Sequence, residues 1–164
     1  MREVIAMFRD LARAKQALSR EESTALLIHA KRGMLSVLGD EGYPYVLPIN
    51  HWYCEEDGKI YFHSGMHGHK IDAIQHCSKA SFCVLDEGTA APDSWWLTFK
   101  SVIVFGTIEI VADHETALEI TRKLSWKFTQ DEDYIQRELE EAGGRVLVFA
   151  LVPEHITGKR VTER

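Results

Sequence analysis

The longest run of alternating residues in the chain, Trp96–Val111, constrains the fold most strongly. Apolar side chains recur there at alternate positions and share one face of an extended strand. They are Val102, Val104, Ile108 and Ile110. Gly106 interrupts this row, and a glycine inside a strand is typical of a bend or a bulge. The run therefore predicts a long β-strand that bends near Gly106.

Shorter strands are predicted before and after this run, and turns rich in glycine and acidic residues join several of them. The predicted strands are Met34–Leu38, Tyr45–Cys54, Ile60–Ser64, Lys79–Asp86 and Arg145–Val152. Pro48 lies within the second of them. Because proline has no N–H to donate to a neighbouring strand, that strand should lie at a sheet edge or contain a bulge at this point.

Helices are predicted between the strands, near residues 19–31, 68–77 and 113–129, and an acidic helix covers 131–142. Ser19 and Glu22 have the spacing of a capping box at the start of the first one. Residues 1–17 look helical and form a peripheral N-terminal segment. Six strands, mostly joined by short turns, predict a mainly β protein with a small antiparallel barrel and peripheral helices. We expect one domain over residues 1–164.

Composition excludes several classes of partner. The formal net charge is −6, so diffuse attraction to nucleic acid is not expected. The longest wholly apolar run, Val146–Val152, is too short to span a membrane. The three cysteines, Cys54, Cys77 and Cys83, form no CxxC pair, which gives a zinc site little support. They are typical of reduced cysteines in a cytoplasmic protein.

The stretch FHSGMHGHK, Phe62–Lys70, concentrates three histidines and a lysine. A metal site made by His63, His67 and His69 is disfavoured, because the intervening glycines make a helix across the stretch improbable. An anion site is better supported, since a helix begins near Gly68 and its N-terminus attracts negative charge. Lys70 would then have an anion to neutralise it. A solvated turn without a ligand remains the alternative from the residues alone.

Three longer segments resemble the FMN-binding split-barrel flavoproteins related to pyridoxamine 5'-phosphate oxidase. The segments are GYPYVLPINHWY (42–53), DGKIYFHSGMHGHK (57–70) and SVIVFGTIEIV (101–111). Within that family the chain looks most similar to the 5-nitroimidazole-resistance branch. The resemblance covers about residues 13–160. It implies a six-stranded antiparallel split barrel, bound FMN, and a homodimer with the flavin at the subunit interface.

Carried over to this chain, the resemblance places the flavin ring along the backbone of Leu47–Asn50 and the phosphate at the end of the FHS strand and the turn before Lys70. The next long strand would also reach the flavin. The implied cofactor-binding residues are Leu47, Pro48, Ile49, Asn50, Phe62, His63, Ser64, His69, Lys70, Ser101 and Val102. His51 is a candidate contact for a substrate.

Departures from the family pattern bear on the reaction. His69 and Lys70 stand where pyridoxamine phosphate oxidases commonly have an arginine–lysine pair, and the end of the chain, ITGKRVTER, does not match their arginine-rich substrate segment. These departures argue against pyridoxamine phosphate oxidation. The resemblance instead suggests an oxidoreductase that passes electrons from NAD(P)H through FMN to a small acceptor such as a nitroaromatic. Non-catalytic binding or storage of flavin or haem is the alternative.

Overall fold

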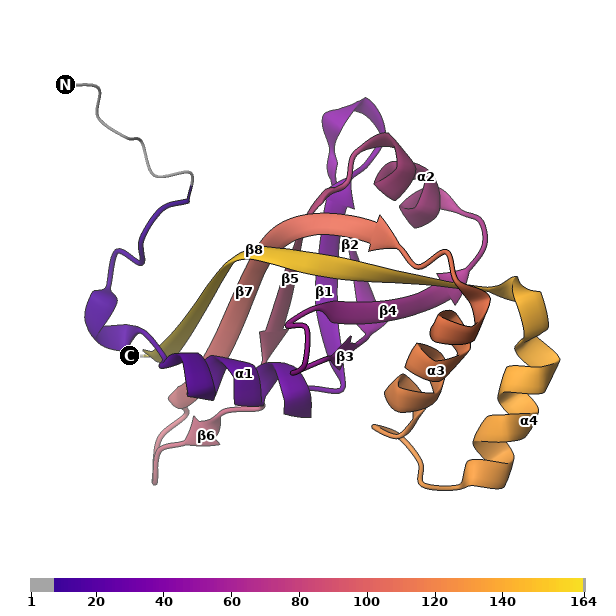
Figure 1. The fold of residues 1–164 in the computed structure, drawn as a ribbon. Coiled ribbons are helices and arrows are strands. Elements are labelled where there is room, and N and C mark those ends of the chain that lie inside the picture. Colours follow the sequence, from indigo (N-terminus) through magenta and orange to yellow (C-terminus); the bar gives the residue numbers. More distant parts are fainter. Residues whose placement is uncertain (1–7, 164) are drawn as a thin grey trace.

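The computed structural model describes residues 8–163, and one curled antiparallel sheet dominates it (Figure 1). The strands are β1 (Arg32–Leu38), β2 (Pro44–Asn50), β3 (Trp52–Tyr53), β4 (Ile60–Gly65), β5 (Lys79–Leu85), β6 (Thr89–Ala90), β7 (Leu97–Ile110) and β8 (Val146–Thr162). They are hydrogen-bonded in the order β2-β1-β5-β7-β8-β4-β3, and β6 pairs with β7. The expected split barrel is therefore confirmed, although it has eight strands rather than six.

Connectivity explains why the sheet curls. Strands β2 and β3 lie at opposite ends of the strand order, yet His51 alone separates them in the chain. The sheet has to roll up so that its two edges meet at this residue. Sequence reasoning expected one continuous strand, Tyr45–Cys54, and missed this break. The chain leaves one edge of the sheet and enters the other there, so a single ladder cannot continue through it.

The long strands β7 and β8 carry the curl. They pair along nearly their whole length, and β8 also pairs with β4 through its first six residues, Val146–Leu151. The register shifts between Phe105 and Gly106, which confirms the predicted bulge. A Cβ at Gly106 would lie 2.0 Å from the carbonyl oxygen of Val152, so the close approach of the two strands requires glycine.

Helices cover the ends of the curl. They are α1 (Arg20–His29), α2 (His69–His76), α3 (His114–Ser125) and α4 (Glu132–Ala142). Helix α1 lies against β3, β5, β7 and β8, α2 packs on β1, and α3 packs on β4 and β8 with α4 outside it (Figure 1). The predicted capping box is present: the Glu22 N–H donates to Ser19 Oγ (3.1 Å) and the Ser19 N–H to Glu22 Oε2 (3.2 Å).

The core fills the inside of the curl with aromatic and branched side chains. Phe62 lies between Phe82 and Phe149, with ring centroids 5.2 Å apart in both pairs. All three are at most 1% exposed. Burying a side chain of this size stabilises a fold by about 1.5–3 kcal/mol. The core thus ties β4, β5 and β8 together beneath the strand ends that carry the predicted site.

Several predicted boundaries were wrong. The last strand runs to Thr162 instead of ending at Val152, because pairing with β7 continues beyond the apolar run. The third helix ends at Ser125, which leaves Phe128 outside it and 39% exposed. In the N-terminal segment, residues 1–7 lie outside the described part. Residues 8–17 contain a short 3-10 helix, Ala14–Gln16, in place of the predicted longer one.

Across residues 8–163, none of the helices is both long enough and apolar enough to cross a bilayer.

Candidate functional site

Strand β2 forms one edge of the sheet, as Pro48 predicted. Its neighbour is β1, with Pro48 opposite Met34 and Asn50 opposite Arg32. Side chains alternate along it, so Ile49 is buried whereas Pro48 and Asn50 face outward. The other side of β2 has no neighbouring strand in the described residues. Its backbone N–H and C=O groups there can meet a ligand.

A hollow of about 330 Å³ opens where this edge approaches β4. It is lined by Arg32, Pro48, Ile49, Asn50 and His63. Four of these five were predicted from the sequence, and the fold brings them together from two separate segments. The volume lies at the small end of the range for ligand sites, which suits part of a planar ring system with the remainder exposed.

Arg32 is the lining residue that sequence reasoning missed. Its Nε–H donates to Asn50 Oδ1 over 3.0 Å, across the β1–β2 pair. The predicted strand began at Met34, two residues too late, so Arg32 was left at the end of the preceding helix and outside the strand. An earlier strand start would have placed Arg32 opposite the LPIN segment.

The pKa values of His63 and Lys70, which lie close together, are both lowered. Burial lowers the pKa of His63, and the positive charge of Lys70 lowers it further, so the imidazole is neutral at neutral pH. Burial also lowers the pKa of Lys70. Both effects work against positive charge in the free protein. A bound anion would reverse them, because it favours the ammonium form of Lys70.

Lys70 and Arg32 are among the basic side chains that have no carboxylate partner in the described residues. Five basic side chains form ion pairs with glutamates: Lys59, Lys100, Arg122, Lys123 and Arg160. Between residues 8 and 163, no carboxylate lies at ion-pairing distance from Arg32 or Lys70. In a chain of net charge −6, an unpaired Arg32 in the lining and an unpaired Lys70 whose charge acts on the lining residue His63 favour an anionic ligand.

The turn before α2 supplies the remaining predicted phosphate contacts. Gly68 has φ of 119°, a backbone conformation that favours glycine, and it starts the helix at His69. His69 itself turns toward the start of β2, where its ring stacks on Tyr45 with centroids 4.1 Å apart. Its Nε2 lies 3.5 Å from Asp40 Oδ2. Ser64 is half-buried on β4.

Seven of the eleven predicted cofactor residues do not line the hollow: Ser64, His69 and Lys70, just described, and four more. Phe62 and Val102 are fully buried, so only their backbone could contact a ligand. Leu47 is half-buried and packs against the core. Ser101 faces outward on β7, between Leu85 of β5 and Lys159 of β8. A single chain therefore does not bring Ser101 to the hollow.

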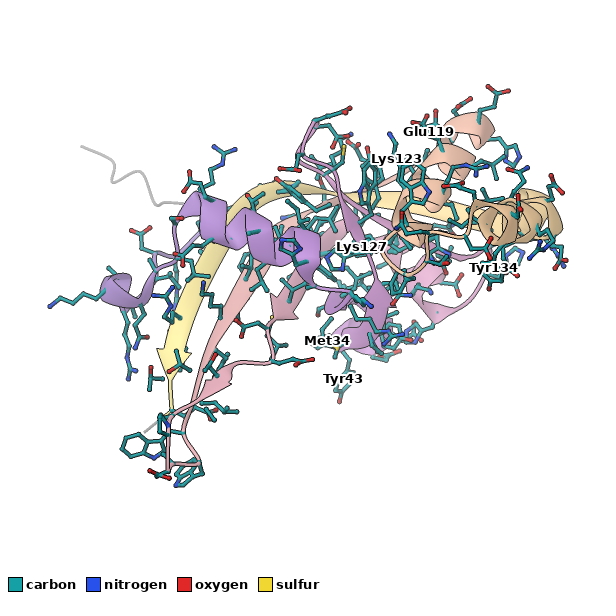
Figure 2. All side chains as sticks on the ribbon, turned by 90° about the horizontal axis from the view of Figure 1, so that it is seen from below. Met34, Tyr43, Glu119, Lys123, Lys127 and Tyr134 are labelled. Atoms are coloured by element: carbon teal, nitrogen blue, oxygen red, sulfur yellow. The ribbon has the colours of Figure 1, made fainter. Side chains whose placement is uncertain are left out.

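His51, the candidate substrate contact, is 0% exposed. Its Nε2 lies 2.8 Å from the Leu27 carbonyl oxygen in α1, and its ring meets the edge of Phe82. Burial lowers the pKa of His51 to about 4, helped by the charge of Lys127. Figure 2 places Lys127 near the end of α1, where Nζ donates to the Ala30 carbonyl over 2.7 Å. The structure thus places His51 in the core.

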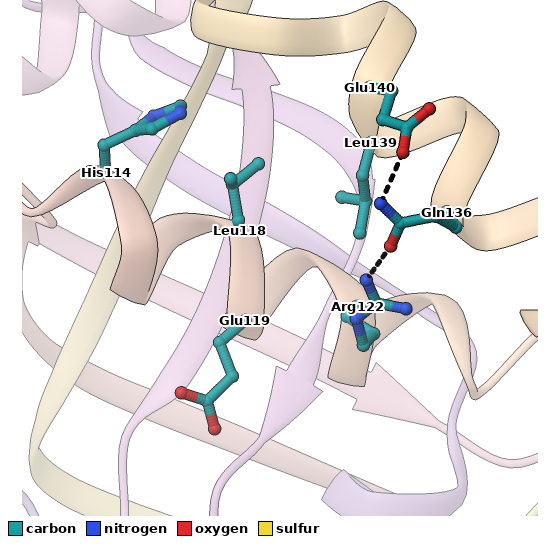
Figure 3. A pocket seen from close by; sticks show the side chains of 7 residues that line it. All are labelled: His114, Leu118, Glu119, Arg122, Gln136, Leu139 and Glu140. Carbon is teal, nitrogen blue, oxygen red and sulfur yellow. Dashed lines mark hydrogen bonds between the residues drawn. The ribbon is translucent and has the colours of Figure 1, made fainter.

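A second hollow, of about 460 Å³, lies between α3 and α4 (Figure 3). Leu118 and Leu139 line it, and its polar groups bind one another. Arg122 donates to Gln136, and Gln136 Nε2 donates to Glu140 Oε1 over 2.7 Å. Because Arg122, Gln136 and Glu140 already hydrogen-bond one another, this hollow has few polar groups left to bind a ligand.

His63, His67 and His69 are not grouped as metal ligands in the described part of the chain. Within residues 8–163, no three His, Cys, Asp or Glu side chains are grouped closely enough to hold a metal ion.

Solved structures with a similar fold include proteins named for flavin and haem binding. A candidate 5-nitroimidazole antibiotic resistance protein from Bacteroides thetaiotaomicron aligns with a TM-score of 0.74 at 21% identity, over 89% of this chain and 87% of that one. An FAD-binding protein from Mesorhizobium loti gives 0.66 at 23% identity, over 89% and 97%. An FAD and haem binding protein from Mycobacterium smegmatis gives 0.68 at 22% identity, over 88% and 72%. At these identities the likeness establishes the fold alone.

None of the curated proteins matched the sequence. Residues 19–160 match the family described as pyridoxamine 5'-phosphate oxidase. That range includes every predicted site residue and the whole of the hollow. With both the split-barrel fold and this match in hand, the chain belongs to the pyridoxamine 5'-phosphate oxidase family.

Proposed function

We propose that the protein binds FMN in the hollow at the free edge of β2 and acts as a flavin-dependent oxidoreductase. The observation that carries this proposal is the pairing of an open strand edge, Leu47–Asn50, with two cations that lack carboxylate partners. A flavin has a planar polar ring and, in FMN, one phosphate. Backbone groups of β2 suit the polar edge of the ring, and Lys70 suits the phosphate.

The residues fit such a cofactor in three respects. The turn at Gly68 starts α2, whose N-terminal dipole attracts a phosphate, and Lys70 lies in its first turn. His63 is neutral and can donate or accept one hydrogen bond beside it. Pro48 withholds an N–H from the edge, which discourages another strand from pairing there. The ring would therefore meet an edge that stays open.

The reaction proposed for the bound flavin is electron transfer from NAD(P)H to a small acceptor. The flavin supplies the redox chemistry, so the chain needs to bind and orient it and to leave one ring face accessible. A nitroaromatic acceptor follows from the sequence resemblance to the 5-nitroimidazole-resistance branch, and the neighbour from Bacteroides thetaiotaomicron supports it. The free cysteines suit the cytoplasm we expect for the protein.

A homodimer completes the proposal. One face of the sheet, pointing away from the core, exposes a continuous set of apolar side chains across four strands. We call this the outer face; its members are Met34, Leu38, Val46, Leu85, Ile103 and Phe105. A patch of this kind on a monomer usually marks a protein interface. Ser101 lies on the same face, so a second copy docked here could bring its Ser101 toward the hollow.

Cofactor extraction from the purified protein, followed by mass spectrometry, tests the proposal directly. The expected result is FMN at about one per chain, with absorption bands at about 370 and 450 nm from the flavin itself. NADH should bleach the longer band without oxygen, and a nitroaromatic should restore it. A flavin that NADH does not bleach would indicate a storage or carrier protein instead.

Haem binding is the second candidate, since the neighbour from Mycobacterium smegmatis is named for both FAD and haem. A Soret band at about 400 nm in the purified protein would favour haem binding. Haem leaves the unpaired Lys70 and the start of α2 without a role, so we prefer the flavin. FAD in place of FMN in the extract would correct the cofactor while leaving the flavin site intact.

A further inference from the structure

We propose that Arg32, acting with Asn50, raises the reduction potential of the bound flavin by stabilising the negative charge that reduction places on the ring. The inference rests on the proposed flavin site and assigns a role to a residue outside the predicted motifs. It concerns the electronics of the cofactor and leaves the affinity for its phosphate to Lys70.

Geometry pairs the two side chains at the sheet edge. Arg32 is the first residue of β1, Asn50 is the last of β2, and their Cα atoms are partners in the ladder. Arg32 Nε–H donates to Asn50 Oδ1 over 3.0 Å, and both residues line the hollow. Among the described residues, the remaining guanidinium N–H groups have neither a carboxylate nor another hydrogen-bond acceptor. They remain available to a ligand.

The hydrogen bond also settles which end of Asn50 is offered to that ligand. Because Oδ1 accepts from Arg32, the NH₂ group of the carboxamide is left to donate elsewhere. Arg32 and Asn50 thus present N–H donors and one full positive charge. The matching ligand group is an acceptor that carries or gains negative charge. In a flavin, the N1 and O2 side of the ring has this character.

Electrostatics assigns Arg32, in the lining of the hollow, and Lys70, whose charge acts on the lining residue His63, to different parts of FMN. Lys70 is partly buried and lies at the start of α2, where burial and the helix dipole both make an anion favourable. The phosphate, the most strongly charged part of FMN, should bind there. Arg32 is exposed and lies at the far end of β2, beside Asn50. The ring, extended along β2, would therefore end at Arg32.

Reduction changes the charge at that end. When the flavin accepts two electrons and one proton, the ring gains one negative charge, spread over N1 and O2. A nearby guanidinium stabilises this form more than the neutral oxidised form. Because Arg32 is exposed, solvent and salt screen its charge. We therefore expect it to change the ratio of the affinities for reduced and oxidised flavin by about tenfold. Tenfold corresponds to about 30 mV for a two-electron couple.

Sulfite provides a test that needs no turnover. Its sulfur donates an electron pair to N5 of oxidised flavin, and the displaced pair of ring electrons ends on N1 and O2, the charge that Arg32 would stabilise. In Arg32→Gln, the dissociation constant of sulfite should rise about tenfold and the potential should fall by about 30 mV. Arg32→Lys keeps the charge and should recover most of both values.

Lys31→Gln is the matched control. It removes the same charge one position earlier, from a side chain whose Nζ lies 6.0 Å from the Phe128 ring centroid. Sulfite affinity and potential should not change in this variant. The double variant Arg32→Gln/Asn50→Ala should lose less than the sum of the two single losses, because the residues act as a pair.

Three outcomes would overturn the proposal. An unchanged potential in Arg32→Gln removes the electronic role. A loss of preference for FMN over riboflavin in that variant makes Arg32 a phosphate ligand. If Lys31→Gln changes sulfite affinity and potential as much as Arg32→Gln does, the change comes from the net charge of the protein and not from the position of Arg32. If the wild-type protein binds no flavin at all, the proposed function itself fails, and this result is distinct from the other three.

Discussion

His51 Nε2 meets the carbonyl oxygen of Leu27 over 2.8 Å, which joins the corner between β2 and β3 to helix α1. For this contact to be a hydrogen bond, Nε2 carries the proton and Nδ1 is bare. Nδ1 is buried and lacks a partner among the described residues. Protonating the ring would put a charge into the core beside Lys127. The corner of the barrel is therefore built around a neutral histidine.

Acid should weaken the fold through His51. The pKa of His51 is about 4 in the folded protein, against 6.5 for an ordinary histidine. As the pH falls from 6.5 to 4, the unfolded chain takes up a proton here that the folded chain does not. This lowers the free energy of unfolding by about 3 kcal/mol, and the loss is absent above pH 6.5. Urea unfolding at several pH values measures it.

The variant His51→Gln separates this effect from the titration of carboxylates. It should be less stable than wild type at neutral pH. It should not lose the unfolding free energy that protonation of His51 removes in acid, so the difference in unfolding free energy between variant and wild type narrows toward pH 4. The exposed His114, changed to Gln, is the control and should follow wild type. A constant difference between His51→Gln and wild type across this range would contradict the prediction.

Lys127→Met should have two effects at the C-terminal end of α1. The Ala30 carbonyl would lose its hydrogen bond from Nζ, which should cost about 1–2 kcal/mol of unfolding free energy. The pKa of His51 should rise, because one of its depressing causes, the Lys127 charge, is gone; burial, the larger cause, remains. NMR titration of the His51 ring detects the second effect. An unaltered pKa would show that the charge is screened from the core.

Removal of the Lys70 charge should weaken FMN binding far more than the fold. A charge-assisted contact to phosphate is worth about 1.5–3 kcal/mol, or roughly ten- to a hundredfold in affinity. Riboflavin lacks the phosphate, so Lys70→Ala should lose the preference for FMN over riboflavin. Titrations of both ligands with wild type and variant measure the ratio. An unchanged ratio would move the phosphate site away from α2.

Met34→Lys should disrupt the proposed dimer. Met34 is 45% exposed on the outer face, and a charge there would be buried against the second copy. Tyr134 on α4 is 46% exposed and lies away from this face (Figure 2), so Tyr134→Lys is the matched control. Light scattering should give a dimer mass for wild type and control and a smaller mass for Met34→Lys. A wild-type monomer that holds flavin would disprove the dimer.

Gly106→Ala should strongly destabilise the sheet. The new Cβ would lie 2.0 Å from the Val152 carbonyl oxygen, so β7 and β8 would have to separate at their bulge. Strain of this kind typically lowers the free energy of unfolding by roughly 1–3 kcal/mol or more. A lowered melting temperature would show it. Gly144→Ala, with no atom within 4 Å of its Cβ position, should melt close to wild type.

Much of the barrel could be predicted because its signals are local. The alternation in β7, the bulge at Gly106, the edge at Pro48 and the capping box of Ser19 with Glu22 each depend on residues close together in the chain. Backbone sterics, hydrogen-bonding capacity and side-chain periodicity act over that range. The LPIN and FHS segments could also be matched to a family, which brought Pro48, Asn50 and His63 into one predicted site.

Other features could not be predicted, because they arise only when distant segments meet. Strand β8 continues to Thr162 because β7 offers it a partner, and Arg32 enters the hollow because β1 pairs with β2 in one register. His51 leaves the predicted site because the curl of the sheet directs it to Leu27. The sequence by itself determined the strands, their edges and the residue types of the site. Tertiary packing decided which side chains face the hollow and which are buried, because burial depends on what lies on the other side of each strand.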